Sequence, residues 1–277
     1  MQEIELTRER LIDLLDRCLI LAWEAGERIM AVYQRGFRVD TKIDDSPVTE
    51  ADMGAHEVVV DGLQSLPRAW PVLSEESVDI PFSARSQWQR YWLVDPLDGT
   101  REFIKRNGEF TVNIALIEGQ ESVLGVIYAP VLDRYYYAAK GCGAYTLDGE
   151  GKPRRIHTRK ADPAHLVIAG SRSHATARFR QFLDRVGSYE LLSVGSSLKS
   201  CRVAEGSADV YARLGPTSEW DTAAAQCIVE EAGGYFTDIH GQRLHYNSKE
   251  SVLNPEFLVY GDGDFDWLRF VPPENGD

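Results

Sequence analysis

The chain has 277 residues, of which 43% are hydrophobic, and a formal net charge of −13 at pH 7. A chain of this length can bury a substantial core, either as one large domain or as two tightly joined lobes. Its acidity excludes a nucleic acid polymer as the main partner, because no basic stripe offsets the charge. No apolar run is long enough for a membrane span or resembles a signal peptide, so we expect neither.

The cysteines indicate the compartment. They are widely scattered, and no two of them form the C-x-x-C pair that would suggest zinc binding or redox exchange. Reduced thiols of this kind are typical of cytosolic proteins. We therefore predict a cytoplasmic protein. Peripheral contact with the inner face of the cell membrane is compatible with this location. The four residues are Cys18, Cys142, Cys201 and Cys227.

The first half of the chain begins with helical patterns and continues with short strands. Apolar residues recur at helical spacing from Thr7 to Arg35, which predicts a long amphipathic helix. Thr49 can cap a second helix, which would place Asp52 in its first turn. The β-like runs that follow are closely spaced and predict an antiparallel meander over 72–73, 91–94, 111–117, 123–128 and 135–138.

Beyond about residue 152, strand and helix patterns alternate, which predicts an α/β arrangement. The expected strands and helices are 166–169, 175–186, 191–194, 197–205, 209–214, 222–232, 235–237 and 257–260. We therefore expect an α+β lobe over residues 1–152 and an α/β lobe over residues 153–277. Because no flexible linker separates them, the two lobes should form one compact unit.

The strongest local signal for chemistry is the segment W-L-V-D-P-L-D-G-T, which ends at Thr100. An apolar strand ends here in a tight turn that carries Asp95 and Asp98. Both carboxylates, together with the carbonyls between them, can reach one hard cation such as Mg²⁺. An Asx-type turn with two solvated aspartates explains the same motif about equally well. The segment alone leaves both interpretations open.

Two further acidic segments stand in comparable positions. Glu75 and Glu76 follow the short strand 72–73, and the segment E-W-D that ends at Asp221 opens an expected helix. Taken alone, the glutamates would be a solvated loop pair. Asp221 alone would be a helix cap, because a carboxylate at a helix N-terminus stabilises the helix by about 0.3–1 kcal/mol.

Taken together, these segments closely resemble the inositol monophosphatase superfamily over nearly the whole chain. The resemblance rests on the E-E pair at Glu75, on D-P-L-D-G-T from Asp95 to Thr100, and on W-D-T-A-A around Asp221. It implies a layered αβαβα fold of the sugar-phosphatase type. It also implies hydrolysis of a phosphate monoester with two or three Mg²⁺ ions, which offset the repulsion between the phosphate and an incoming hydroxide.

The resemblance also implies roles for individual residues. Asp52 and Thr100 would orient the attacking water, and Glu75 would take part in catalysis as well as in metal binding. Lithium and calcium would inhibit by occupying magnesium positions with the wrong charge or geometry. The residues expected to bind metal are Glu75, Asp95, Leu97 through its carbonyl, Asp98 and Asp221.

Other segments resemble one branch of the superfamily, the 3'(2'),5'-bisphosphate nucleotidases. These are S-R-S-H from Ser171, G-S-S-L-K from Gly195 and R-L-G-P-T from Arg213. This branch converts adenosine 3',5'-bisphosphate (PAP) to AMP and phosphate, which removes a by-product of sulfur assimilation. The related 5'-phosphosulfate, PAPS, is a further candidate substrate, with APS as its product. The residues expected to bind substrate are Gly99, Thr100, Ser171, Arg172, His174, Gly195, Ser196, Lys199, Arg213 and Asp221.

The basic residues of these segments suit a second phosphate. Arg172 and Lys199 each follow an expected strand, and arginine binds phosphate bidentately whereas lysine supplies a point charge. Singly, each is better explained as a surface cation, and only the combination with the metal motif favours a ligand. Inositol enzymes carry an acidic residue seven positions before the W-D aspartate. Leu214 stands there in this chain and cannot receive sugar hydroxyls.

Two alternatives remain open. The same hydrolysis could act on an inositol phosphate or a sugar phosphate, or the chain could be a sensor that binds a nucleotide without turnover. Asp52 and Thr100 count against the sensor, because they contribute to water activation. We expect a small-molecule nucleotide as partner and a monomer or weak dimer. The first lobe should carry most metal ligands and the second lobe the nucleotide-recognition segments.

Overall fold

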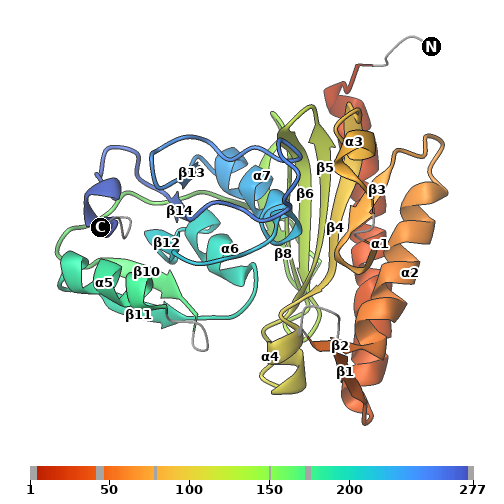
Figure 1. Cartoon of the computed structure of the whole chain (residues 1–277), viewed down its shortest axis with the longest axis horizontal. Coiled ribbons are helices and arrows are strands. Elements are labelled where there is room, and N and C mark those ends of the chain that lie inside the picture. Colours follow the sequence, from red (N-terminus) through yellow and green to blue (C-terminus); the bar gives the residue numbers. More distant parts are fainter. Residues whose placement is uncertain (1–4, 42–46, 78–79, 150, 172–175, 274–277) are drawn as a thin grey trace.

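Five layers of secondary structure make up the protein (Figure 1). The computed structural model describes residues 5–41, 47–77, 80–149, 151–171 and 176–273. Helices on the right of the view cover one face of a large sheet, a second pair of helices covers its other face, and a smaller sheet with an outer helix completes the stack. The αβαβα arrangement expected from the sequence is confirmed.

The outermost helical layer consists of α1 (Arg8–Gln34) and α2 (Glu50–Gln64). Thr49 caps α2 as predicted, since its hydroxyl accepts from the backbone N–H of Ala51 at 3.1 Å and Asp52 completes a capping box. A two-stranded sheet of β1 (Val39–Thr41) and β2 (Pro47–Thr49) precedes α2. Among the described helices, none combines the length and apolar character needed to cross a bilayer.

The larger sheet has seven strands in the order β3-β4-β5-β6-β7-β8-β9. β3 and β4 pair in parallel, so the predicted antiparallel meander is wrong for the run 72–73, because η1 and α3 form a crossover between these two strands. Every later pair is antiparallel, which confirms the meander for the remaining strands. The short helices η1 (Glu75–Ser77), α3 (Phe82–Arg85) and α4 (Thr100–Ile104) flank the first strands. The strands are β3 (Val72–Ser74), β4 (Arg90–Asp98), β5 (Thr111–Glu118), β6 (Glu121–Ala129), β7 (Arg134–Ala139), β8 (Gly143–Leu147) and β9 (Arg154–Ile156).

The smaller sheet has five strands in the order β11-β10-β12-β14-β13, with β10 parallel to both of its neighbours. Its strands are β10 (Val167–Gly170), β11 (Glu190–Ser193), β12 (Val210–Arg213), β13 (Tyr235–Asp238) and β14 (Phe257–Tyr260). The helices of this half are α5 (Ala177–Val186), α6 (Leu198–Ala204), η2 (Glu219–Asp221), α7 (Ala223–Glu231) and η3 (Leu268–Phe270). The parallel strands with intervening helices confirm the expected α/β character.

Three apolar clusters hold the layers together. One joins α1 and α2 to the large sheet, one lies between the two sheets around α6 and α7, and one packs α5 on the small sheet. Side chains of β4 alternate between the first two clusters: Trp92 and Val94 face α1 and α2, whereas Tyr91 and Leu93 face the inner layer. The same alternation directs Asp95 towards the inner layer, between the sheets.

The sequence anticipated most of the long elements but missed several short ones. β8 and β9 lack a strong alternating apolar pattern, and α3 and α4 are too short to show helical periodicity. β9 begins after residue 153 yet pairs with β8 of the larger sheet. α7 likewise packs against both sheets, so apolar packing joins the two halves of the chain closely.

Gly125 allows α7 to approach β6. A Cβ atom at this position would lie 2.2 Å from the carbonyl oxygen of Ala224, which is a backbone atom. We expect Gly125→Ala to lower the free energy of unfolding by about 1–3 kcal/mol, because α7 must shift away from the sheet. Urea denaturation measures the change. Gly54→Ala is the matched control: nothing lies within 4 Å of its added Cβ, so inside α2 it should be neutral or stabilising.

Candidate active site

Three acidic side chains from separate segments converge between the two sheets. Oxygen atoms of Glu75, Asp95 and Asp221 lie within 4.8 Å of one another. Glu75 opens η1 directly after β3, Asp95 lies on β4, and Asp221 ends η2. Carboxylates at this separation can bind a common hard cation. The structure therefore brings together three of the predicted metal ligands from both halves of the sequence.

The expected turn is instead a continuation of β4, which runs to Asp98 with a shift of register between Asp95 and Asp98, and the Asp95 side chain and Gly99 shape this bend. Asp95 Oδ1 accepts from the backbone N–H of Leu97 at 3.0 Å. Gly99 has a φ of +92°, a left-handed conformation that favours glycine. A Cβ on Gly99 would lie 3.3 Å from Ser196 Cβ, so a larger residue would crowd the cavity. The D-P-L-D-G motif thus directs two aspartates to one side of the bend.

Asp98 is held beside this group by a network that the sequence did not reveal. Its Oδ2 accepts from the backbone N–H of Ser197 at 2.6 Å and from Asn113 Nδ2 at 3.5 Å. The Ser197 hydroxyl donates to Asn113 Oδ1 at 2.9 Å and also pairs with Thr111 Oγ1 at 2.8 Å. Thr111 and Asn113 are polar positions within an otherwise apolar strand, and that interruption is the signal that could have identified them.

Burial makes this acidic group unfavourable without a cation. Burial, followed by the charge of Glu75, raises the pKa of Asp95 well above its usual range. Burial, followed by the charge of Asp98, raises the pKa of Asp221 to about 7. Burial also raises the pKa of Asp98, although the Lys199 ammonium opposes that shift. The donor atoms are all oxygens, and the negative charges of the carboxylates repel one another. Such a group fits a divalent cation such as Mg²⁺.

Asp52 and Thr100 form a hydrogen-bonded pair next to the acidic group. The Thr100 hydroxyl donates to Asp52 Oδ1 at 3.0 Å and lies 3.4 Å from the Leu97 carbonyl oxygen. Asp52 Oδ2 accepts from both the backbone N–H and the hydroxyl of Thr49, each at 2.7 Å. Burial raises the pKa of Asp52, and the Thr49 hydrogen bonds oppose this. The pair has the geometry expected for orienting a water molecule.

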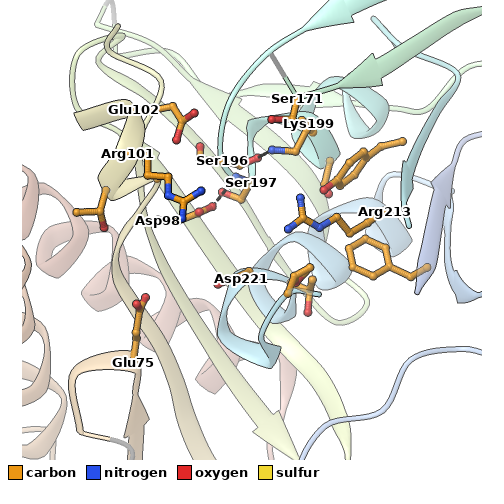
Figure 2. Close-up of a pocket in the computed structure, with 17 residues that line it drawn as sticks. Glu75, Asp98, Arg101, Glu102, Ser171, Ser196, Ser197, Lys199, Arg213 and Asp221 are labelled. Carbon is orange, nitrogen blue, oxygen red and sulfur yellow. Dashed lines mark hydrogen bonds between the residues drawn. The ribbon is translucent and has the colours of Figure 1, made fainter. Parts of the chain in front are cut away.

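A cavity of about 220 Å³ lies beside the acidic group. Figure 2 shows Glu75, Asp98 and Asp221 around one part of it, and Lys199 and Arg213 on the right-hand side of the view. Lys199 is only 6% exposed, and its Nζ donates to the Ser196 carbonyl at 2.5 Å and lies over the ring of Tyr211. One cavity thus brings acidic and basic side chains together, with Arg101 on the same side as Asp98.

Most predicted substrate-binding residues line this cavity, although three need comment. Those that line it are Gly99, Thr100, Ser171, Ser196, Lys199, Arg213 and Asp221. The N–H of Gly195 donates to Glu109 Oε2 at 2.9 Å, so this amide is already engaged by the protein. Arg172 and His174 lie outside the described residues. Cavity-lining residues that the sequence did not single out are Arg101, Glu102, Ser197, Ser200, Tyr211, Thr217, Thr222 and Phe257.

Comparison with known proteins identifies the family. The model of the "Inositol monophosphatase family" matches residues 15–260. This chain belongs to that family. The match covers both halves of the sequence and every residue of the acidic group described above. The expectation drawn from the sequence motifs is therefore confirmed at the level of the family.

The relatives include bisphosphate nucleotidases. The chain is 50% identical over 249 residues to the 3'(2'),5'-bisphosphate nucleotidase CysQ of Escherichia coli K12, covering 89% of this chain and 99% of that protein. The crystal structure of CysQ from Bacteroides thetaiotaomicron is similar with a TM-score of 0.78 and 42% identity, covering 90% and 97% of the two chains. The suhB protein of Bartonella henselae also has a TM-score of 0.78, at 26% identity over 94% and 98%.

Asp98→Asn tests the metal site with little change in shape. The amide oxygen can still accept from Ser197, but a charged oxygen ligand is lost. We expect phosphatase turnover to fall by about 100-fold or more, because cation binding weakens. The melting temperature without added metal should rise, because less buried charge repels Asp221. Turnover assays at several Mg²⁺ concentrations and thermal melts with a chelator measure both effects. Near-normal turnover would remove Asp98 from the metal site.

Mg²⁺ binding should weaken as the pH falls below 7. The pKa of Asp221 is raised to about 7, so its carboxyl is largely protonated below that pH and must lose its proton to bind a cation. Each further pH unit should weaken binding about tenfold for every proton that the cation displaces, and the raised pKa values of Asp95 and Asp98 add to the effect of Asp221. Calorimetric Mg²⁺ titrations at pH 7 in two buffers of different ionisation enthalpy measure the protons released. Equal heats in the two buffers would contradict the prediction.

Proposed function

We propose that this protein hydrolyses the 3'-phosphate of adenosine 3',5'-bisphosphate to give AMP and phosphate. The observation that carries the proposal is one cavity lined by the carboxylates of Glu75 and Asp221 and by two cations, the buried Lys199 and the partly exposed Arg213. A substrate with two phosphates at a fixed separation suits such a site. One phosphate would meet the metal-binding acids and the other the protein cations. The similarity to CysQ proteins supports the same substrate.

The proposed metal ligands are the predicted ones. Glu75, Asp95 and Asp221 would bind Mg²⁺ through their carboxylates, with Asp98 and the Leu97 carbonyl completing a site for two or three ions. Bound magnesium lowers the pKa of a coordinated water and offsets the charge of the phosphate. The family is generally magnesium-dependent, which supports this cofactor. Lithium and calcium should inhibit by competing for the same oxygen ligands.

Water activation is assigned to the Asp52 and Thr100 pair. Since the Thr100 hydroxyl donates to Asp52 Oδ1, its lone pairs are available to accept a proton from the attacking water. The hydroxyl proton would pass to Asp52, whose pKa is raised by burial. The water oxygen would form the new bond to phosphorus as the bond between phosphorus and the 3'-oxygen breaks, and the 3'-oxygen would take up a proton from solvent. Glu75 would contribute through the metal that it helps to bind.

Recognition of the second phosphate is assigned to Lys199, Arg213 and Ser196. Arg213 Nη2 donates to the Pro216 carbonyl at 2.6 Å, which fixes the guanidinium at the cavity wall. Leu214 is 3% exposed and packs in the apolar cluster beneath α5, so it offers nothing to the hydroxyls of an inositol ring. This favours a nucleotide over the inositol alternative. We place the reaction in the cytoplasm, a proposal that the four free cysteines support.

A substrate panel tests the function directly. We expect PAP to give the highest kcat/KM in the presence of Mg²⁺, with PAPS as a second substrate. Inositol 1-phosphate and fructose 1,6-bisphosphate should be poor substrates, because the buried Leu214 stands where inositol enzymes have an acidic residue and cannot bind sugar hydroxyls. Phosphate release measures each rate. A preference for inositol 1-phosphate would reject the nucleotide assignment, and nucleotide binding without metal-dependent turnover would favour a sensor.

Lys199→Ala separates recognition of the second phosphate from chemistry. We expect kcat/KM for PAP to fall by about 10- to 100-fold at saturating Mg²⁺, because a charge-assisted contact contributes about 1.5–3 kcal/mol. A small monophosphate ester has no second phosphate and should be affected much less. An equal loss on both substrates would assign Lys199 to the reacting phosphate or to the fold. Mg²⁺ must be saturating because the charge of Lys199 also interacts with Asp98, a proposed metal ligand. Any change in metal affinity then does not affect the measured rates.

A further inference from the structure

Glu219 is a buried carboxylate that the proposed chemistry does not use. It lies two residues before the metal ligand Asp221 in η2, and it is 0% exposed. Its Oε2 accepts from the backbone N–H of Asn247 at 2.9 Å, and Lys249 Nζ lies 3.5 Å from its Oε1. Burying a carboxylate is unfavourable unless it makes specific contacts, so its presence here requires a structural reason.

Asn247 connects Glu219 to Arg85. The Asn247 side chain makes two hydrogen bonds to Arg85: its Oδ1 accepts from Nη1, and its Nδ2 donates to the backbone carbonyl at 2.6 Å. Arg85 is 2% exposed, and its Nη2 donates to the carbonyl of Lys249 at 3.1 Å and to that of Glu250. Asn247 has a φ of +54°. In this conformation its backbone N–H donates to Glu219 while its side chain contacts Arg85.

Glu219, Asn247 and Arg85 thus form a chain of hydrogen bonds, called here the polar chain. Its two ends are fixed on separate elements. At one end, the Glu219 N–H donates to the Val252 carbonyl at 2.8 Å, and Asn254 Nδ2 donates to the Ser218 carbonyl at 2.7 Å. At the other end, the N–H of Trp88 donates to the Arg85 carbonyl at 3.0 Å, just before β4 begins. The polar chain therefore joins η2 to the start of β4, the strand that carries Asp95, a second proposed metal ligand.

We propose that Glu219 is a positioning residue that holds Asp221 opposite Asp95. The carboxylates at the metal site repel one another, and η2 is a single short turn that could yield to that repulsion. The buried chain from Glu219 through Asn247 to Arg85 prevents this movement, so the ligands are already in place when a cation binds. This inference rests on the metal-dependent function proposed above and adds a specific support for its metal site.

Metal affinity is the measurement that separates positioning from general stability. We expect Glu219→Ala to raise the dissociation constant for Mg²⁺ about 10- to 100-fold, as loss of a supporting contact to a metal ligand typically does. KM for PAP at saturating Mg²⁺ should stay within about twofold, because Glu219 does not line the cavity. Calorimetric titration with Mg²⁺ alone measures the first quantity without requiring turnover.

Two milder variants keep the test informative if Glu219→Ala folds poorly. Glu219→Gln retains an oxygen that can accept from Asn247, so Mg²⁺ affinity should stay within about threefold of the original. Asn247→Gly keeps the backbone N–H and tolerates the positive φ, but it loses both contacts to Arg85. Its Mg²⁺ affinity should fall between those of the two Glu219 variants.

Glu230→Ala is the matched control. Glu230 accepts from Arg243 Nε at 2.8 Å and Nη2 at 2.7 Å, so its loss also breaks a partly buried ion pair. This ion pair involves α7 and lies outside the polar chain of Glu219, Asn247 and Arg85. It should lower the melting temperature and leave Mg²⁺ affinity unchanged. The inference is wrong if Glu219→Ala weakens Mg²⁺ binding no more than this control, or if Glu219→Gln weakens it as much as Glu219→Ala. Tight Mg²⁺ binding without PAP hydrolysis would instead reject the proposed function alone.

Discussion

The repulsion among buried carboxylates is the constraint on which the active site depends. Glu75, Asp95 and Asp221 are held within reach of one another, and Asp98 lies beside them, although burial and mutual charge raise the pKa values of these aspartates. Such a group persists only where the surrounding backbone fixes each member and a cation can offset the charge. Hydrogen bonds from Leu97, Ser197 and Ser218 to the three aspartates provide that fixation.

The layered fold supplies the rigidity that this arrangement requires. Asp95 faces the space between the sheets because side chains alternate along β4, and Asp221 enters the same space just before α7. α7 packs closely on β6, where Gly125 leaves room for its backbone. Apolar packing in the inner layer therefore fixes the distance between acids that are far apart in sequence. The site is formed where the two halves of the chain meet.

The residues proposed for metal binding and those proposed for substrate recognition share one hydrogen-bond network. Ser197 donates its backbone N–H to Asp98 and its hydroxyl to Asn113, and it immediately precedes α6, which carries Lys199. Ser196, with a left-handed φ of +44°, lies against Gly99, which directly follows Asp98. A change in the position of α6 would therefore reach Asp98 directly. This coupling suits a substrate whose two phosphates must be held at a fixed separation.

The sequence by itself determined the family and the order of the long elements, because residue types at short spacing form the family's motifs and local periodicity predicts helices and strands. The capping of α2 by Thr49 was likewise readable from neighbouring residues. The family resemblance implied that Asp52 and Thr100 act together, but only the tertiary structure decided the atomic contacts between distant groups. The pairing of Thr100 with Asp52, the support of Asp98 by Asn113 and the burial of Glu219 all join segments that no local pattern relates, because packing of the five layers sets those distances.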